Sequence, residues 1–146
     1  MRRSMIVASA VLVTVMMGST AALADSPHIV GSPSTTVSGN SLILSASVAG
    51  LGNASTATFS LIGTVDVSSR CYTKSGNKPQ AANKQETISV NSTETFAVRN
   101  GRTNASFTVT PLSTLTCPGG QHVVIESVTY SLALTYQGKT LFTFTS

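Results

Sequence analysis

The chain offers few side chains that could carry out chemistry, and its cysteines are the first to consider. Cys71 and Cys117 are the only two cysteines in 146 residues. A zinc site would need CxxC spacing or more histidines than His28 and His122, whereas two thiols in an oxidising compartment favour a disulfide. Closing a loop of this length restricts the unfolded chain and stabilises a small domain by roughly 4 kcal/mol. The sequence therefore predicts a Cys71–Cys117 disulfide and no metal site.

Catalysis would need a nucleophile, a base and an orienting group close together. His122 follows CPGGQ and lies near Glu126, but no serine stands in a G-x-S-x-G context. The acidic residues that could form a catalytic pair are Asp25, Asp66, Glu86, Glu94 and Glu126. Their spacing identifies no pair, and the loops hold too little acid for calcium. We therefore expect a protein that is not an enzyme and has no cofactor.

The first 24 residues have the features of a secretory signal peptide. Arg2 and Arg3 give a basic start, residues 5–18 are apolar, and Ala22-Leu23-Ala24 supplies small residues at the cleavage position. The apolar run is shorter than the roughly 20 residues that a membrane span needs. We expect residues 25–146 to be secreted or associated with the cell surface, without a membrane span; the alternative is an uncleaved N-terminal anchor.

The mature part, 122 of the 146 residues, has the size of one domain. Without Arg2 and Arg3, seven basic residues stand against five acidic ones, a net charge of +2. This surplus is too small to indicate nucleic-acid binding, and no basic run with interleaved aromatic residues supports it.

Apolar and hydroxyl residues alternate from Ser41 onward, which is typical of half-buried β-strands. The alternating stretches are 42–48, 57–67, 88–98, 105–109, 124–136 and 139–145. Asn100-Gly101 suits a tight hairpin, because both positions tolerate positive φ. Residues 25–40, rich in Pro, Ser, Gly and Thr, are expected to form an extended segment with a short edge strand around Ile29.

This pattern predicts an all-β protein, an antiparallel immunoglobulin-like β-sandwich of about six to eight strands over residues 41–146, with one disulfide. The apolar phase of each strand should face one core between two sheets. The side chains that we expect there are Phe59, Leu61, Phe107, Val128, Tyr130 and Leu132.

One basic, amide-rich loop interrupts the alternation. It reads CYTKSGNKPQAANKQE, residues 71–86, and the expected disulfide would tie its base to PGGQ. Loops fixed on a rigid scaffold often carry binding residues. The candidates are Tyr72, Lys74, Asn77, Lys78, Gln80, Asn83, Lys84 and Gln121. Their partner would be an extracellular glycan, an envelope polymer or a protein; the alternative is a solvated connection without a binding role.

The loop and the second cysteine region resemble those of small exported proteins of unassigned function with a pattern C…GN.P…NK, then NG, then CPGGQ…SV.YS. The matching residues are Cys71, Gly76, Asn77, Pro79, Asn83, Lys84, Asn100, Gly101, Cys117, Pro118, Gly119, Gly120, Gln121, Ser127, Val128, Tyr130 and Ser131. The resemblance covers most of the chain beyond residue 54. It implies a disulfide-linked β domain that leaves the cell and implies no activity.

Two functions remain in competition at this point. The first is a secreted or cell-surface binding domain without catalysis, adhesin-like or in contact with glycans or the envelope. The second is a structural subunit of an extracellular assembly, in which residues 139–145 or the segment before Asn40 pair with another copy. Three N-x-[ST] motifs, at Asn53, Asn91 and Asn104, are close to the number expected by chance and favour neither function.

Overall fold

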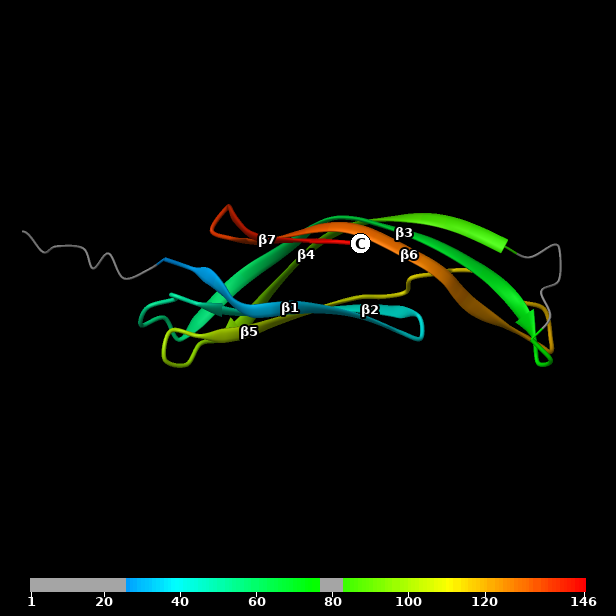
Figure 1. The fold of residues 1–146 in the computed structure, drawn as a ribbon, viewed down its shortest axis with the longest axis horizontal. Helices are drawn as coiled ribbons and strands as arrows, with labels where there is room; N and C mark the ends of the chain where they lie inside the picture. Colours follow the sequence, from blue (N-terminus) through cyan, green and yellow to red (C-terminus); the bar gives the residue numbers. More distant parts are fainter. Residues whose placement is uncertain (1–25, 77–82) are drawn as a thin grey trace, which may run out of the picture.

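Seven antiparallel strands form two facing sheets in the computed structural model, which describes residues 26–76 and 83–146 (Figure 1). The strands are β1 (His28–Ser38), β2 (Ser41–Ala49), β3 (Thr56–Thr73), β4 (Asn83–Ala97), β5 (Thr103–Val109), β6 (Gln121–Tyr136) and β7 (Lys139–Thr145). One sheet has the order β1-β2-β5 and the other β4-β3-β6-β7. The predicted all-β sandwich is confirmed. The expected signal peptide, residues 1–24, lies outside the described residues.

The strand order is that of an immunoglobulin-like sandwich, except that the fourth strand, β4, belongs to the sheet of β3, β6 and β7. In constant-type immunoglobulin domains the fourth strand lies beside the fifth, in the ABED sheet. Here β4 pairs with β3 along its whole length, from Thr56↔Ala97 to Arg70↔Asn83. The four-stranded sheet is therefore the larger one, and β4 forms one of its edges.

The turn at Asn100-Gly101 has the predicted backbone but a different place in the fold. Its φ angles are 52° and 71°, and Arg99 and Arg102 exchange two backbone hydrogen bonds of 2.9 and 3.0 Å. The strands that it connects, β4 and β5, belong to different sheets. The turn therefore carries the chain from one layer of the sandwich to the other.

The core lies between the layers and is centred on aromatic rings. The ring of Phe59 lies 5.1 Å from that of Tyr136 and 6.1 Å from that of Phe96, and Phe96 meets Phe107 edge-on at 5.7 Å. Each of these rings comes from the apolar phase of its strand. The two sheets are thus joined by contacts that span β3, β4, β5 and β6.

Four of the six predicted core side chains are buried, namely Phe59, Leu61, Phe107 and Leu132. Val128 and Tyr130 are only half-buried and pack against the core from its side. The β7 ladder ends opposite Ser131, and the last contact on this side of β6 is between Ser146 and the backbone of Tyr130. Among the described residues, no strand therefore lies beside Val128 on this side of β6. The sequence predicts correctly which side chains of β6 face inward, but it does not predict the residue at which their full burial ends.

The N-terminal segment forms a longer strand than the short one expected around Ile29. β1 pairs with β2 from His28↔Ala49 to Ser38↔Ser41, with an irregularity between Val30 and Ser34. Gly31 and Pro33 lie within this irregularity. An edge strand tolerates such residues, because one side of its backbone needs no partner.

β3 and β6 extend beyond the three-stranded sheet, and the chain between β5 and β6 runs beneath them (Figure 1). We call residues 110–120 the β5–β6 segment. Asn40, in the β1–β2 turn, holds it: Asn40 Nδ2 donates to Ser113 O at 3.0 Å and Asn40 Oδ1 accepts from Ser113 N at 2.7 Å. The backbone oxygen of Asn40 also accepts from Leu112 N at 2.9 Å. The open end of the sandwich is closed by this segment instead of a strand.

Candidate functional site

The disulfide lies at the extended end of β3, as predicted. Cys71 and Cys117 are bonded, with their Cα atoms 5.6 Å apart, and Cys71 is fully buried. The bond joins β3 to the β5–β6 segment, so the beginning of β6 is fixed against the end of β3. Both strands can therefore act as a rigid support for side chains on the opposite, outer face of the sheet.

Alternation along β3 places Arg70 and Tyr72 on that outer face, because Cys71 between them points inward. His122 is directly opposite Tyr72 in the ladder. The register shifts by one residue between Ser68 and Ser69, which places Glu126 in an irregular position of β6 beside them. We call Arg70, Tyr72, His122 and Glu126 the outer-face cluster.

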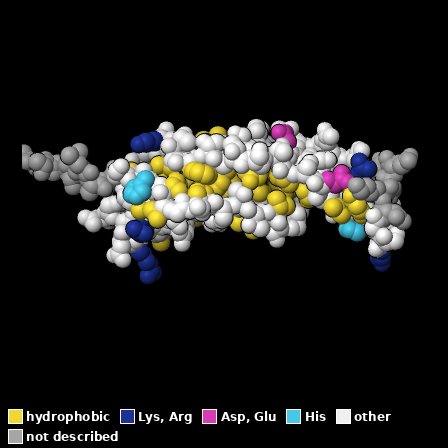
Figure 2. Space-filling model, in the orientation of Figure 1, with side chains coloured by type: hydrophobic (Ala, Val, Ile, Leu, Met, Phe, Trp, Pro, Cys, Tyr) yellow, Lys and Arg dark blue, Asp and Glu magenta, His cyan; other side chains and the backbone are white. Residues whose placement is uncertain are grey.

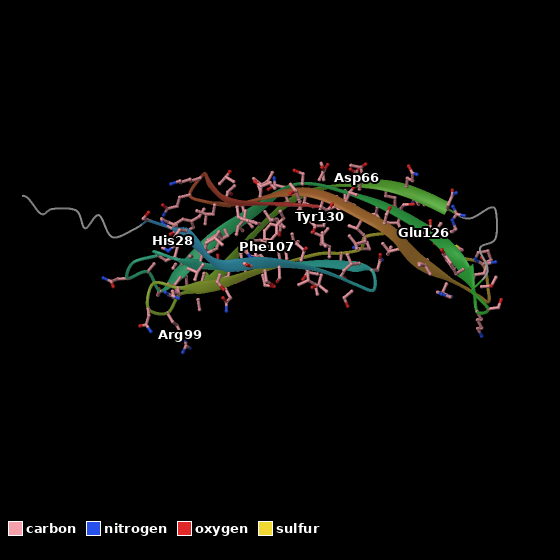
Figure 3. The ribbon with its side chains drawn as sticks, in the orientation of Figure 1. His28, Asp66, Arg99, Phe107, Glu126 and Tyr130 are labelled. Atoms are coloured by element: carbon pink, nitrogen blue, oxygen red, sulfur yellow. A yellow bond between two sulfur atoms is a disulfide. The ribbon has the colours of Figure 1, made fainter. Side chains whose placement is uncertain are left out.

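The members of the outer-face cluster contact one another. The Tyr72 hydroxyl donates to Glu126 Oε1 at 2.7 Å, and Arg70 Nε lies 3.5 Å from Glu126 Oε2. The rings of Tyr72 and His122 have centroids 6.5 Å apart. Figure 3 shows Glu126 at this end of the molecule, far from Arg99 at the other. Two rings, a guanidinium and a carboxylate on a firm sheet give a surface that can stack and form hydrogen bonds.

Lys84, one of the predicted binding residues, has a different position. It lies in β4 opposite the buried Ser69 and therefore belongs to the inner face. Its Nζ is 3.2 Å from Glu86 Oε1 and also donates to the Thr114 hydroxyl. The structure thus engages Lys84 with the β5–β6 segment and separates it from Tyr72 by the thickness of the sheet.

Glu86 is the centre of this inner-face contact, which the sequence did not reveal. It accepts hydrogen bonds from the Thr114 hydroxyl and from Thr114 N, the latter at 2.9 Å. These bonds, with a smaller contribution from Lys84, lower the pKa of Glu86 to about 2. Glu86 stays ionised at neutral pH and holds the β5–β6 segment against β4.

The other predicted binding residues are divided among several positions. Lys74 is exposed in a turn closed by a 2.9 Å bond from Gly76 N to Thr73 O. Asn83 is exposed at the start of β4, opposite Arg70. Gln121 begins β6 on the inner face, and its Oε1 is buried without a hydrogen-bond partner among the described residues. Asn77, Lys78 and Gln80 lie outside the described residues.

Three members of the outer-face cluster were not predicted as binding residues. The sequence suggests His122 and Glu126 only as candidates for catalysis, and it gives no signal for Arg70. Their connection could have been found by continuing the alternation of β3 past Val67, since Ser69 and Cys71 keep the inward phase and Arg70 and Tyr72 the outward one. The apolar signal ends at Val67, because the next inward residue is a serine.

No group of three or more metal-ligating side chains that could hold an ion occurs within residues 26–76 and 83–146. In the same part of the chain, no helix is long and apolar enough to cross a membrane. Comparisons with protein-family models, with curated proteins and with solved structures find no match to this chain.

Proposed function

We propose that the protein is a non-catalytic binding domain, secreted or held at the cell surface, and that the outer-face cluster is its contact surface. The observation that supports this most is the 2.7 Å bond between Tyr72 and Glu126 beside Arg70. It fixes an aromatic ring and two charged groups in place before any partner arrives. A surface ordered in advance loses less entropy on binding.

The chemistry of the surface fits an extracellular glycan or an envelope polymer better than an apolar partner. The rings of Tyr72 and His122 can lie against the faces of sugar rings, while Arg70, Glu126 and the Asn83 amide offer donors and acceptors. The exposed Lys74 adds a positive charge nearby. A protein partner with a polar surface is the remaining possibility within the same proposal.

The proposed location outside the cell agrees with the disulfide. Cys71 is fully buried and bonded to Cys117. Disulfides of this kind persist in oxidising compartments and are rare in the cytosol. The expected signal peptide over residues 1–24 and the resemblance to small exported proteins point in the same direction.

The alternative, a structural subunit that adds strands to another copy, is less well supported because two of the four sheet edges, β4 and β1, carry features that hinder pairing. On β4, Glu94 is opposite the buried Phe59 and thus belongs to the inner phase of an edge strand, yet it is exposed. On β1, the irregularity with Pro33 interrupts the ladder. Inward-phase charges, bulges and prolines at edges are known means of preventing edge-to-edge association.

Retention of purified residues 25–146 on cell-envelope material and on culture-fluid polymers tests the proposal. Tyr72→Ala should weaken retention by about tenfold, the effect of a typical energetic hot spot. The matched control is Ile62→Ala, which shortens a side chain that is 47% exposed in the middle of β3. Equal retention of the two variants would reject the outer-face cluster. Concentration-dependent dimers in sedimentation, abolished by changes in β1 or β7, would favour the structural alternative.

A further inference from the structure

A second surface lies at the other end of the sandwich, around the turn between β4 and β5. Arg99 and Arg102 form a direct cross-strand pair, joined by backbone hydrogen bonds in both directions. Residues paired in this way project from the same face of the ribbon. Two like charges directly opposite each other destabilise a ladder. The arrangement therefore concentrates positive charge at a cost in stability, which a bound anion would offset.

The backbone that carries these two arginines is held from several sides. Leu51 N donates to Gly101 O at 3.1 Å, and Val98 N donates to Ser55 O at 2.9 Å. The Thr103 hydroxyl donates to Ala97 O at 2.7 Å. The turn is thus fixed to the loop between β2 and β3 and to its own flanking residues. The backbone positions of Arg99 and Arg102 are therefore fixed before any ligand binds.

No carboxylate of the described residues forms an ion pair with either arginine. Among residues 26–76 and 83–146, neither Arg99 nor Arg102 has an ion-pair partner, whereas Arg70 and Lys84 each do. On the face seen in Figure 2, basic side chains and a histidine lie at both ends of the molecule, whereas acidic side chains are seen over the middle and near the end away from the start of β1. Figure 3 shows Arg99 projecting away from the sandwich. Both guanidinium groups keep their donors available.

The two arginines line an open groove of about 640 Å³. Gly31 forms part of its wall, and the space beside it is open, since a Cβ atom there would meet no atom within 4 Å. Ser47 and Asn104 lie in this groove and also in an adjoining one that continues over β1 and β2. The adjoining groove is lined by Ser32, Ser34, Ser45, Ala46, Ser47 and Asn104. Hydroxyl and amide groups therefore lead away from the arginine pair along the outer face of the three-stranded sheet.

One contact within this path prepares Asn104 for a ligand. The Ser47 hydroxyl donates to Asn104 Oδ1 at 2.6 Å, which orients the amide and leaves its nitrogen as a donor. A row of hydroxyl and amide groups matches the hydroxyls of a sugar chain, and paired guanidinium groups match a carboxylate, which they can bind in a bidentate manner.

We propose that these joined grooves, which we call the arginine groove, bind an acidic saccharide chain. Arg99 and Arg102 hold the carboxylate of one uronic-acid unit, and Ser47 and Asn104 contact the hydroxyls of the next. This site is separate from the outer-face cluster and does not depend on the proposed function above.

Calorimetric titration of unglycosylated residues 25–146 with trigalacturonic acid tests the arginine groove. Protein without glycan is required, because Asn104 itself belongs to an N-x-S motif. The methyl-esterified trisaccharide has the same chain without the charges. It should bind about tenfold more weakly than the acid, and binding of the acid should weaken as salt rises. Equal binding of acid and ester, or no binding of the acid, overturns the proposal without any variant being needed.

Variants then assign the site. Arg99→Gln with Arg102→Gln should reduce the affinity for the acid by about tenfold or more, while Lys74→Gln with Lys139→Gln removes the same charge elsewhere and should change it by less than about twofold. Asn104→Ala should weaken binding of trigalacturonate but not of inorganic phosphate. If the arginine variant binds as well as the wild type, the groove is not the site. If phosphate competes fully at the same concentration as trigalacturonate, the saccharide part of the proposal is wrong.

Discussion

The hydroxyl oxygens of Ser69 and Ser113 lie 2.6 Å apart in the interior, between β3 and the β5–β6 segment. Both side chains are buried, Ser69 completely. The Ser113 hydroxyl also accepts from Leu115 N at 3.1 Å. A polar pair thus occupies an inward-facing position of β3 where an apolar residue would be expected. It connects β3 to the β5–β6 segment at the end of the sandwich that carries the disulfide.

Ser69→Ala should destabilise the fold by about 1–3 kcal/mol, because it removes the buried hydrogen bond between the two hydroxyls and leaves Ser113 with only its bond from Leu115 N. Ser113→Ala should have a similar effect, and the double variant should cost clearly less than the sum of the two. Chemical denaturation of the four proteins measures the coupling. Strict additivity would show that the two hydroxyls do not interact.

The pH dependence of stability should report Glu86. Its pKa is lowered from the usual 4.5 to about 2 in the folded protein, so the folded state binds fewer protons than the unfolded state between these values. The contribution of Glu86 is complete above pH 4.5, declines as the pH falls and is lost below about pH 2. Glu86→Gln should therefore flatten the stability profile in this range. Glu94→Gln, at an exposed glutamate of the same strand, is the control; equal profiles for both variants would contradict the assignment.

Gly63→Ala should be among the most damaging single changes in the sheet. The φ of Gly63 is 151°, and a Cβ atom there would lie 2.0 Å from the backbone oxygen of Ser131 on β6. Because backbone cannot move aside at small cost, we expect a loss of at least about 2 kcal/mol in denaturant unfolding. Gly119→Ala, where the added atom would meet nothing within 4 Å, should have little effect. Similar losses at both positions would contradict the close approach.

Phe107→Ala should cost about 3–5 kcal/mol, as expected for a buried aromatic residue. Phe107 is 2% exposed and packs against Phe96 from the other sheet. Thermal or denaturant unfolding measures the loss. A value below about 1 kcal/mol would mean that β5 does not present this face to the core.

The sequence predicts the strands and turns well because their signals are local. Alternation identifies the inward phase of β2, β3 and β5, and the two residues at Gln137-Gly138 adopt the positive φ of a tight turn, 49° and 77°. The disulfide follows from the number of cysteines. What these signals cannot give is the sheet to which a strand belongs, since Asn100-Gly101 looks the same whether it joins neighbours or crosses between layers.

The candidate site was predicted only in part, because its contacts depend on register and on long-range closure. Tyr72 was identified, but its bond to Glu126 arises from an irregularity in β6 that no local pattern shows. The sequence pattern predicts Lys84 in a loop, but β4 begins at Asn83 and places Lys84 in a strand. Its contact with Glu86 and Thr114 forms only when the β5–β6 segment folds back under the sheet.

Amide hydrogen exchange of residues 25–146, with and without the envelope polymer that retains the wild-type protein, tests the proposed binding surface most directly. We expect the polymer to increase amide protection at residues 70–76 and 121–126, where β3 and β6 carry the outer-face cluster. The Tyr72→Ala variant should show no such increase at the same polymer concentration. Protection confined to β1 or β7, or unchanged exchange at residues 70–76 while the polymer is bound, would contradict the assignment of this surface.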